Sequence, residues 1–276
     1  MDRHPITGWQ ARLELDFVRR DDATILAGRR HFGPLRVQKA LHPEGPGICH
    51  AIVLHPPAGI CGGDRLSISV AVGDAGHALL TTPGAGKWYR SAGQQARQAL
   101  DFRVGPGATL EWLPQESIVF DGARGLMASR VSLAQGACFI GWEVLCLGRR
   151  ASGERFGRGE LRLSTRIELA GAPIWAERGK IAGGSALQDS PIGLAGRTVS
   201  ATLLAAGADI APAPTLKSSA CLACCPALRY HLPAPGVVSS AWPASPTVAE
   251  MLSRSPPQMP AGGCSTIAWQ TPGPSG

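Results

Sequence analysis

Apolar and polar residues alternate along much of the chain, and glycine-containing turns interrupt the alternation at short intervals. Residues 66–72 read Leu-Ser-Ile-Ser-Val-Ala-Val, which has the period of two of a half-buried β-strand. A turn follows at 73–76, and a second apolar run begins at His77. Similar strand–turn–strand units return at 100–112, 131–147 and, more loosely, 161–177.

The turn glycines of these four units recur about every thirty residues, a spacing typical of repeat architectures. They are Gly76, Gly107, Gly136 and Gly171. Each unit is too small to bury its own apolar face, so stacked copies would share one continuous core. We therefore predict an all-β fold, a coiled and stacked β-sheet that is β-helix-like, with little helix. Residues 92–100 are a helix candidate with weak periodicity.

Composition supports a folded β protein. Of 276 residues, 44 % are hydrophobic and 17 % are charged, so a core can be buried. The 35 glycines and 23 prolines suit many short strands. The formal charge of +7 is spread over scattered arginines and aromatics are only 5 %, which argues against nucleic-acid binding. We interpret the excess charge as a solvated face that can meet an acidic partner.

The N-terminus lacks the apolar stretch of an export signal. The longest apolar region, near 137–148, contains Glu143 and is too short to span a bilayer. We expect a soluble, cytoplasmic protein with no membrane contact. Its 8 cysteines are then mostly reduced, as core residues or ligands.

The C-terminal part changes character. After about Leu216, proline, serine and alanine crowd together, Glu250 is the only acidic residue, and periodicity disappears. We predict an N-terminal extension (1–8), a β domain (9–215) and a poorly ordered tail (216–276). The tail begins with three cysteines for which we predict no fixed metal site: Cys221, Cys224 and Cys225.

The stretch from His50 to Leu66 contains a proline pair and then a glycine-rich turn that ends in Asp64. A carboxylate presented there can hold a cation, but aspartate in a turn also caps backbone amides, and local chemistry favours the turn role. Histidines and cysteines also gather in this part of the chain, without the close repeated spacing of a preformed tetrahedral metal site. They are His42, Cys49, His50, His55, Cys61 and His77.

The sequence suggests two further classes of site. Residues 81–87 resemble a phosphate-binding loop, but Thr81 stands where glycine is needed and Trp88 follows Lys87, so the motif fails.

Carboxylates also lie in or beside apolar strands. Paired acids can hydrolyse glycosides, but buried carboxylates are costly unless paired or metal-bound, so a polar interior path for a cation is the more natural role. The carboxylates are Glu111, Glu116, Asp121, Glu143 and Glu177.

Several stretches resemble the UreD/UreH family of urease accessory proteins, in order, over about residues 9 to 205. They are Gly33–Gln38, His42–Gly45, Leu54–Pro57, Gly62–Leu66, Ala78–Pro83, Lys87–Ser91, Leu110–Glu116, Phe120–Gly122, Gly141–Glu143, Cys146–Gly148 and Gly153–Phe156.

The resemblance implies a non-enzymatic chaperone that helps insert nickel into apo-urease, together with UreF and the GTPase UreG. It implies a coiled β-sheet fold with an interior channel through which nickel passes, with no tightly bound cofactor. Asp64 and Glu177 match acidic positions along that channel. Glu116, Asp121 and Glu143 match acidic motif positions whose role is assigned less directly.

The chain departs from the family at its C-terminus, which lacks the usual amphipathic helix and short Arg-Ile-Trp-like end. A change of reading frame near Leu216 would produce such a composition, and partner docking through this part is then in question. Two alternative functions stay open from the residues: a β-helical carbohydrate-active enzyme and a stand-alone nickel-binding protein.

Overall fold

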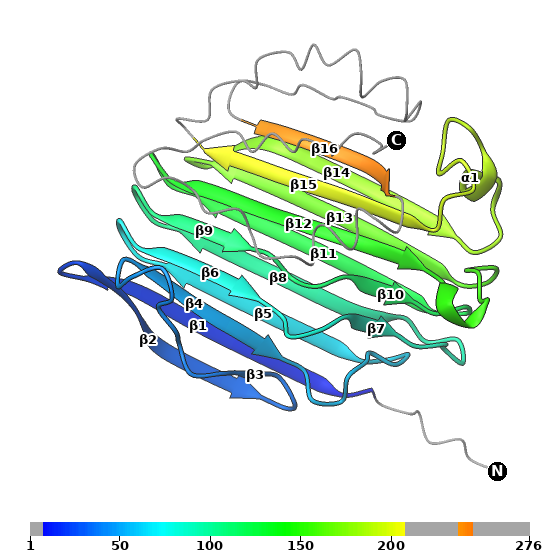
Figure 1. Cartoon of the computed structure of the whole chain (residues 1–276), viewed down its shortest axis with the longest axis horizontal. Coiled ribbons are helices and arrows are strands. Elements are labelled where there is room, and N and C mark those ends of the chain that lie inside the picture. Colours follow the sequence, from blue (N-terminus) through cyan, green and yellow to red (C-terminus); the bar gives the residue numbers. More distant parts are fainter. Residues whose placement is uncertain (1–7, 208–236, 245–276) are drawn as a thin grey trace, which may run out of the picture.

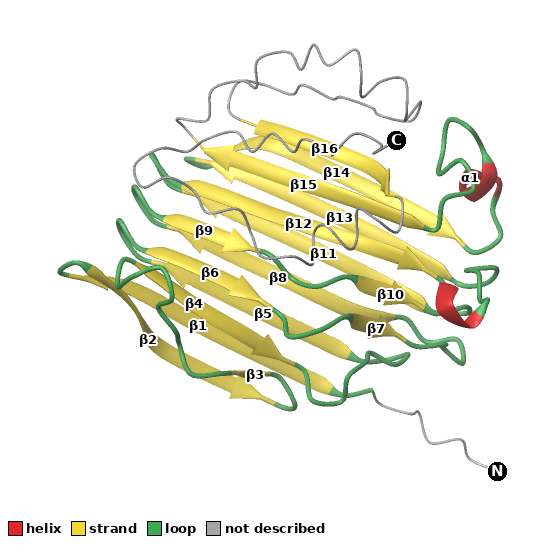
Figure 2. Ribbon diagram, in the orientation of Figure 1, coloured by secondary structure: helices red, strands yellow, loops and turns green. Residues whose placement is uncertain are grey.

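The computed structural model describes residues 8–207 and 237–244, and over these residues the chain forms a β-solenoid of two facing sheets (Figures 1 and 2). The predicted all-β fold with little helix is confirmed. Apart from strands, these residues form one 3-10 turn (Arg150–Ser152) and α1 (Ala186–Asp189). Neither is long or apolar enough to cross a membrane.

The first sheet has seven strands, and its centre is parallel. In spatial order the strands are β14 (Ala172–Ala182), β13 (Glu160–Leu169), β11 (Arg124–Leu133), β8 (Ala96–Val104), β5 (Arg65–Val72), β1 (Gln10–Arg20) and β2 (Ala23–Phe32). β5, β8 and β11 lie side by side in parallel, with β1 and β13 parallel to them on either side. β2 and β14 form the two edges as antiparallel strands.

The second sheet has nine strands. Its path runs β16 (Val237–Ala244), β15 (Val199–Gly207), β12 (Cys138–Leu147), β9 (Thr109–Trp112), β6 (His77–Thr81), β4 (Ile48–Leu54) and β3 (Arg36–Val37). The short strands β7 (Gly86–Trp88) and β10 (Ser117–Val119) pair beside this path. β16 falls inside the segment predicted as a poorly ordered tail, and the rest of 216–276 lies outside the described residues.

The predicted units prove to be of two kinds. In the first three, the chain passes through a tight turn from one sheet to the other, from β5 to β6, β8 to β9 and β11 to β12. Gly107 and Gly136 have φ of 62° and 72° in two of these turns. In the turn before β6, Ala75 takes the left-handed conformation (φ 52°) instead of Gly76. In the fourth unit, β13 and β14 form an antiparallel hairpin within one sheet around Gly171.

The helix candidate at 92–100 is wrong, since Ala96–Val104 is strand β8. Phe102 and Val104 alternate with exposed Arg103 in it, and both are buried in the core between the sheets. The Phe102 ring packs against Trp112 of the facing sheet, with centroids 5.5 Å apart. Tertiary pairing on both sides thus outweighs a weak local helix preference.

Three neighbouring strands of the second sheet are interrupted at matching positions. The interruptions are residues 55–59 after β4, 82–85 between β6 and β7, and 113–116 between β9 and β10. Each contains proline, which cannot donate a ladder hydrogen bond. We call these three segments the strand break. β12 runs on without a gap and pairs first with β9 and then with β10.

Candidate functional site

A cavity of about 620 Å³ lies between the two sheets. Its lining includes residues of all three segments of the strand break, among them His55, Thr82 and Gln115. The lining also includes Glu143 and Glu177. Because β12 pairs with β9 at Gly141 and with β10 at Leu145, Glu143 lies beside the 113–116 segment of the strand break. Across the coils the cavity therefore extends from His55, after β4, to Glu177 on β14.

Strand register points both carboxylates into this cavity. Glu143 on β12 lies opposite Thr202 on β15, and Glu177 on β14 lies opposite Thr165 on β13. Side chains alternate between the two faces of a strand, and the neighbours of Glu143 two residues away, Gly141 and Leu145, also line the cavity. Each sheet thus contributes one Glu–Thr pair to the space between them.

The two carboxylates influence each other electrostatically. Burial, and in second place the negative charge of Glu177, together raise the pKa of Glu143 to about 7. A cation between them would replace this repulsion by attraction and favour the ionised form. The pair is thus arranged to receive a positive charge from the cavity.

His55 lies at the other end of the cavity, in the strand break. Burial lowers the pKa of its imidazole, and the carboxylate of Asp64 offsets part of that effect. The ring is therefore neutral at neutral pH, which is the form that binds transition metals.

Asp64 is buried, but it is not part of the cavity lining. Its Oδ1 accepts a hydrogen bond from the Trp9 N–H at 2.8 Å, and its Oδ2 accepts one from the Cys61 N–H at 2.8 Å. The geometry shows the capping role that local turn chemistry favours. It ties the first residues of the sheet domain to the glycine-rich turn.

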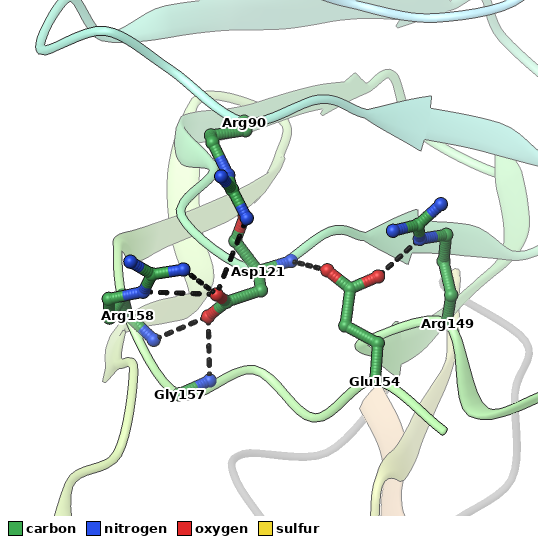
Figure 3. A network of polar contacts seen from close by, with 6 residues as sticks. All are labelled: Arg90, Asp121, Arg149, Glu154, Gly157 and Arg158. Carbon is green, nitrogen blue, oxygen red and sulfur yellow. Dashed lines mark hydrogen bonds and ion pairs between the residues drawn. The ribbon is translucent and has the colours of Figure 1, made fainter. Parts of the chain in front are cut away.

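Asp121 also acts as a structural tie (Figure 3). Its carboxylate accepts hydrogen bonds from the backbone N–H groups of Gly157 and Arg158 and forms an ion pair with the Arg158 guanidinium at 2.6 Å. The hydrogen bond from the Arg158 side chain is the main cause that lowers the pKa of Asp121. Glu154 accepts a bond from the Asp121 N–H and pairs with Arg149. This network joins the loops after β10 and β12.

The remaining candidates are dispersed. Glu116 is not in the cavity lining, although its chain neighbours Gln115 and Ser117 are. His50 contacts Glu44 and His77 contacts Glu111, each at 2.7 Å. Within residues 8–207 and 237–244, no three or more His, Cys, Asp or Glu side chains gather into a group that could hold a metal ion. The cysteines from 221 to 225 lie outside the described residues.

The structure therefore brings together two of the five predicted acidic residues, Glu143 and Glu177. The polar partners around them were missed by sequence reasoning. Thr165 and Thr202 stand directly opposite the two carboxylates, but only strand pairing reveals this. Threonine is common in β-strands, so its presence there does not indicate a site.

Comparison with known proteins gives consistent matches. The family model described as UreD urease accessory protein matches residues 10–257, which include all the cavity-lining residues. The chain is 59% identical over 199 residues to the urease accessory protein UreD of Azoarcus sp. (strain BH72), covering 72% of this chain and 70% of that protein. It is 54% identical over 228 residues to the protein of that name from Dechloromonas aromatica, covering 83% and 77%.

Proposed function

The chain belongs to the UreD family of urease accessory proteins, non-catalytic chaperones of urease maturation, and we propose that it conducts nickel through the cavity between its sheets. The observation that carries the proposal is the pair Glu143 and Glu177, which face one cavity from opposite sheets. Family membership decides against the carbohydrate-active alternative.

The chemistry of the lining suits passage of nickel more than storage. Carboxylate and hydroxyl oxygens bind nickel less firmly than imidazole or thiolate. Two carboxylates supply fewer ligands than a closed structural site uses. An ion held by Glu143 and Glu177 would thus be attracted into the cavity and released again without a large barrier.

The strand break is the proposed entrance. Its lining residues Pro83 and Gly84 are exposed to solvent, and His55, also of the strand break, lines the same cavity. The neutral imidazole of His55 is the stronger nickel ligand and would receive the ion first. The exposure of Glu177 to solvent supports an exit beside this residue.

The partners follow from the family. We propose that the chain acts in the cytoplasm in a complex with UreF, the GTPase UreG and apo-urease, and that the nickel ion is cargo rather than a resident cofactor. Asp64 contributes by fixing the turn next to His55, through the two backbone hydrogen bonds that its carboxylate accepts.

The test is the nickel content of urease in cells that co-express this chain with UreF, UreG and the urease subunits. The double variant Glu143→Gln, Glu177→Gln removes both charges with little change of volume. We expect urease nickel content and activity to fall at least about fivefold, because the cation loses its two anionic contacts. The matched control is Glu14→Gln, on the outside of β1. It should give the same urease nickel content and activity as the unmodified chain.

A thermal unfolding midpoint no lower than that of the unmodified chain would show that the fold of the double variant is intact. Urease of normal nickel content from cells with that variant would contradict the channel role of the two carboxylates.

A further inference from the structure

The outer face of the seven-stranded sheet divides into two electrostatically different halves. In one half, carboxylates balance the basic residues. Glu14 and Asp16 pair with Arg30, Asp101 with Arg103, and Glu168 with both Arg130 and Arg166, which makes four carboxylates and four arginines. This half of the face is locally neutral.

The half at the beginning of β5, β8, β11 and β13 is strongly basic. Register aligns Arg65 with Arg97 on the neighbouring strand, and Arg162 with Lys180. Leu126 stands between these two pairs, so one row of side chains crosses five strands. At about 4.8 Å per strand, this row is roughly 19 Å long.

Neighbouring positions add three arginines to that row. We call the whole set the basic face, and its members are Arg12, Arg65, Arg97, Arg124, Arg162, Arg178 and Lys180. All seven are exposed. The strand partner of Arg124 is Glu160, the one carboxylate at these aligned positions, which leaves a formal excess of six positive charges. The chain as a whole carries +7.

Glu160 does not neutralise this set. It pairs with Lys180 at 2.8 Å and with Arg162 at 2.6 Å, and hydrogen bonds from these two side chains lower its pKa to about 2. The other five members have no ion pair within the described part of the chain: Arg12, Arg65, Arg97, Arg124 and Arg178. Like charges directly opposite on neighbouring strands cost stability. The arrangement therefore does not serve the fold.

We propose that the basic face docks a carboxylate-rich protein surface in the urease maturation complex. Six of its seven members are arginine, whose planar fork binds carboxylates in a bidentate manner. Small side chains, Ser67 and Ala99 among them, lie next to the row and leave room for a partner to approach. The inference rests on the proposed function, since it takes the partner to be a protein of that complex.

A nucleic acid is the competing polyanion. Single strands bind through stacking on successive aromatic side chains, and the aligned positions of this face hold one, Phe32 opposite Arg12. The sheet is also covered on its other side by the core, so it offers an outer surface and no enclosed groove. We therefore favour the protein partner.

The test compares two triple variants with the same change of net charge. One is Arg65→Glu, Arg97→Glu, Arg124→Glu, within the basic face. The control is Arg20→Glu, Arg29→Glu, Lys39→Glu, at exposed positions outside it. A fluorescent poly-glutamate peptide serves as the purified probe, and the complex co-expressed with UreF, UreG and the urease subunits serves as the assembled one.

We expect poly-glutamate to bind the unmodified chain in a salt-sensitive manner. Binding should weaken at least about tenfold in the basic-face variant and at most about twofold in the control. In the co-expressed complex, the basic-face variant should lose one of the named proteins while the control retains it. Equal poly-glutamate binding by both variants, or retention of every protein by the basic-face variant, would overturn the proposal.

A DNA duplex provides the remaining comparison. The proposal would also be overturned, in favour of a nucleic acid, if the unmodified chain bound the duplex more tightly than poly-glutamate at the same salt concentration and the basic-face variant lost this duplex binding. Failure of the unmodified chain to raise the nickel content of urease would count against the proposed function instead, because poly-glutamate binding is measured without urease.

Discussion

The two sheets of the solenoid share one core but present opposite kinds of surface outward. The outer face of the seven-stranded sheet carries arginines that are exposed and carboxylates that, apart from Glu168, are half-buried. The outer face of the nine-stranded sheet carries Leu79, Leu113 and Ile140, which are 5 %, 5 % and 8 % exposed and pack together with Trp142 and Leu203. A second apolar cluster on that face is formed by Val144, Val199 and Ala201.

This difference explains a feature of the sequence. Strand β5 alternates strictly, because one side faces the core and the other faces water. Strand β12 reads Cys-Phe-Ile-Gly-Trp-Glu-Val-Leu-Cys-Leu, an almost continuous apolar run, because both of its sides are covered with apolar neighbours. Within β12, Glu143 is the exception, and it points into the cavity.

The largest expected effect comes from placing a charge on the apolar outer face. Ile140→Asp should lower the free energy of unfolding by at least about 3 kcal/mol, because a carboxylate buried among Leu79 and Leu113 has no partner. Urea unfolding of the purified protein measures the change.

The matched substitution on the other sheet is Ser67→Asp, beside Arg12 on the neighbouring strand. It should change the unfolding free energy by less than about 0.5 kcal/mol. Equal losses for the two variants would show that the two outer faces do not differ as described.

A smaller effect is expected between the sheets, where the pKa of Glu143 is raised to about 7. A carboxyl whose pKa is higher in the folded state stabilises the fold fully below its unfolded pKa, and that stability is lost as pH rises through 7. Glu143→Gln should therefore raise the unfolding free energy by roughly 2 kcal/mol at pH about 8 and leave it unchanged near pH 4. Glu177 is the charged group that adds to the shift.

Chemical unfolding across this pH range measures the difference between the two proteins. Glu14→Gln, whose carboxylate pairs with Arg30 on the outer surface, is the control that should not reproduce the pattern. Parallel pH profiles for the unmodified chain and Glu143→Gln would contradict the raised pKa.

The smallest effect is expected on the basic face. Arg97→Glu replaces a like-charge pair with Arg65 by an opposite-charge pair, so stability should rise by a few tenths of a kcal/mol. Arg103→Glu on the same strand breaks the ion pair with Asp101 and should act in the opposite direction. Both changes in stability should become smaller in high salt, because salt screens exposed charges. A gain in stability for Arg97→Glu that persists in high salt would contradict this electrostatic explanation.

Sequence alone predicted the strands well, because each depends on local alternation. The units at 66–82, 100–112 and 131–147 appear as β5–β6, β8–β9 and β11–β12. It did not predict whether a turn stays in one sheet or crosses to the other, since both use the same glycine chemistry. The hairpin around Gly171 and the crossing turn at Gly107 look alike in sequence but place their strands differently.

The same limit applies to the site. Glu143 and Glu177 were both recognised as acidic residues within strands, but their meeting in one cavity depends on the pairing of β12 with β15 and β13 with β14. Asp64 and Asp121 are also acidic residues beside strands, but their carboxylates accept hydrogen bonds from backbone N–H groups. Carboxylate type and spacing do not distinguish these roles, because the deciding partner is far away in the sequence.

The order of strands in the parallel centre has a consequence for synthesis of the protein. Ile68 pairs with Leu100, and Phe102 pairs with Val131, so each coil rests on the coil that left the ribosome just before it. A growing chain can therefore add one coil at a time to a template that is already in place. Because β1 pairs with β2 on one side and with β5 on the other, the parallel centre grows away from β2. At each stage the strand added last leaves an open edge that can pair with another molecule.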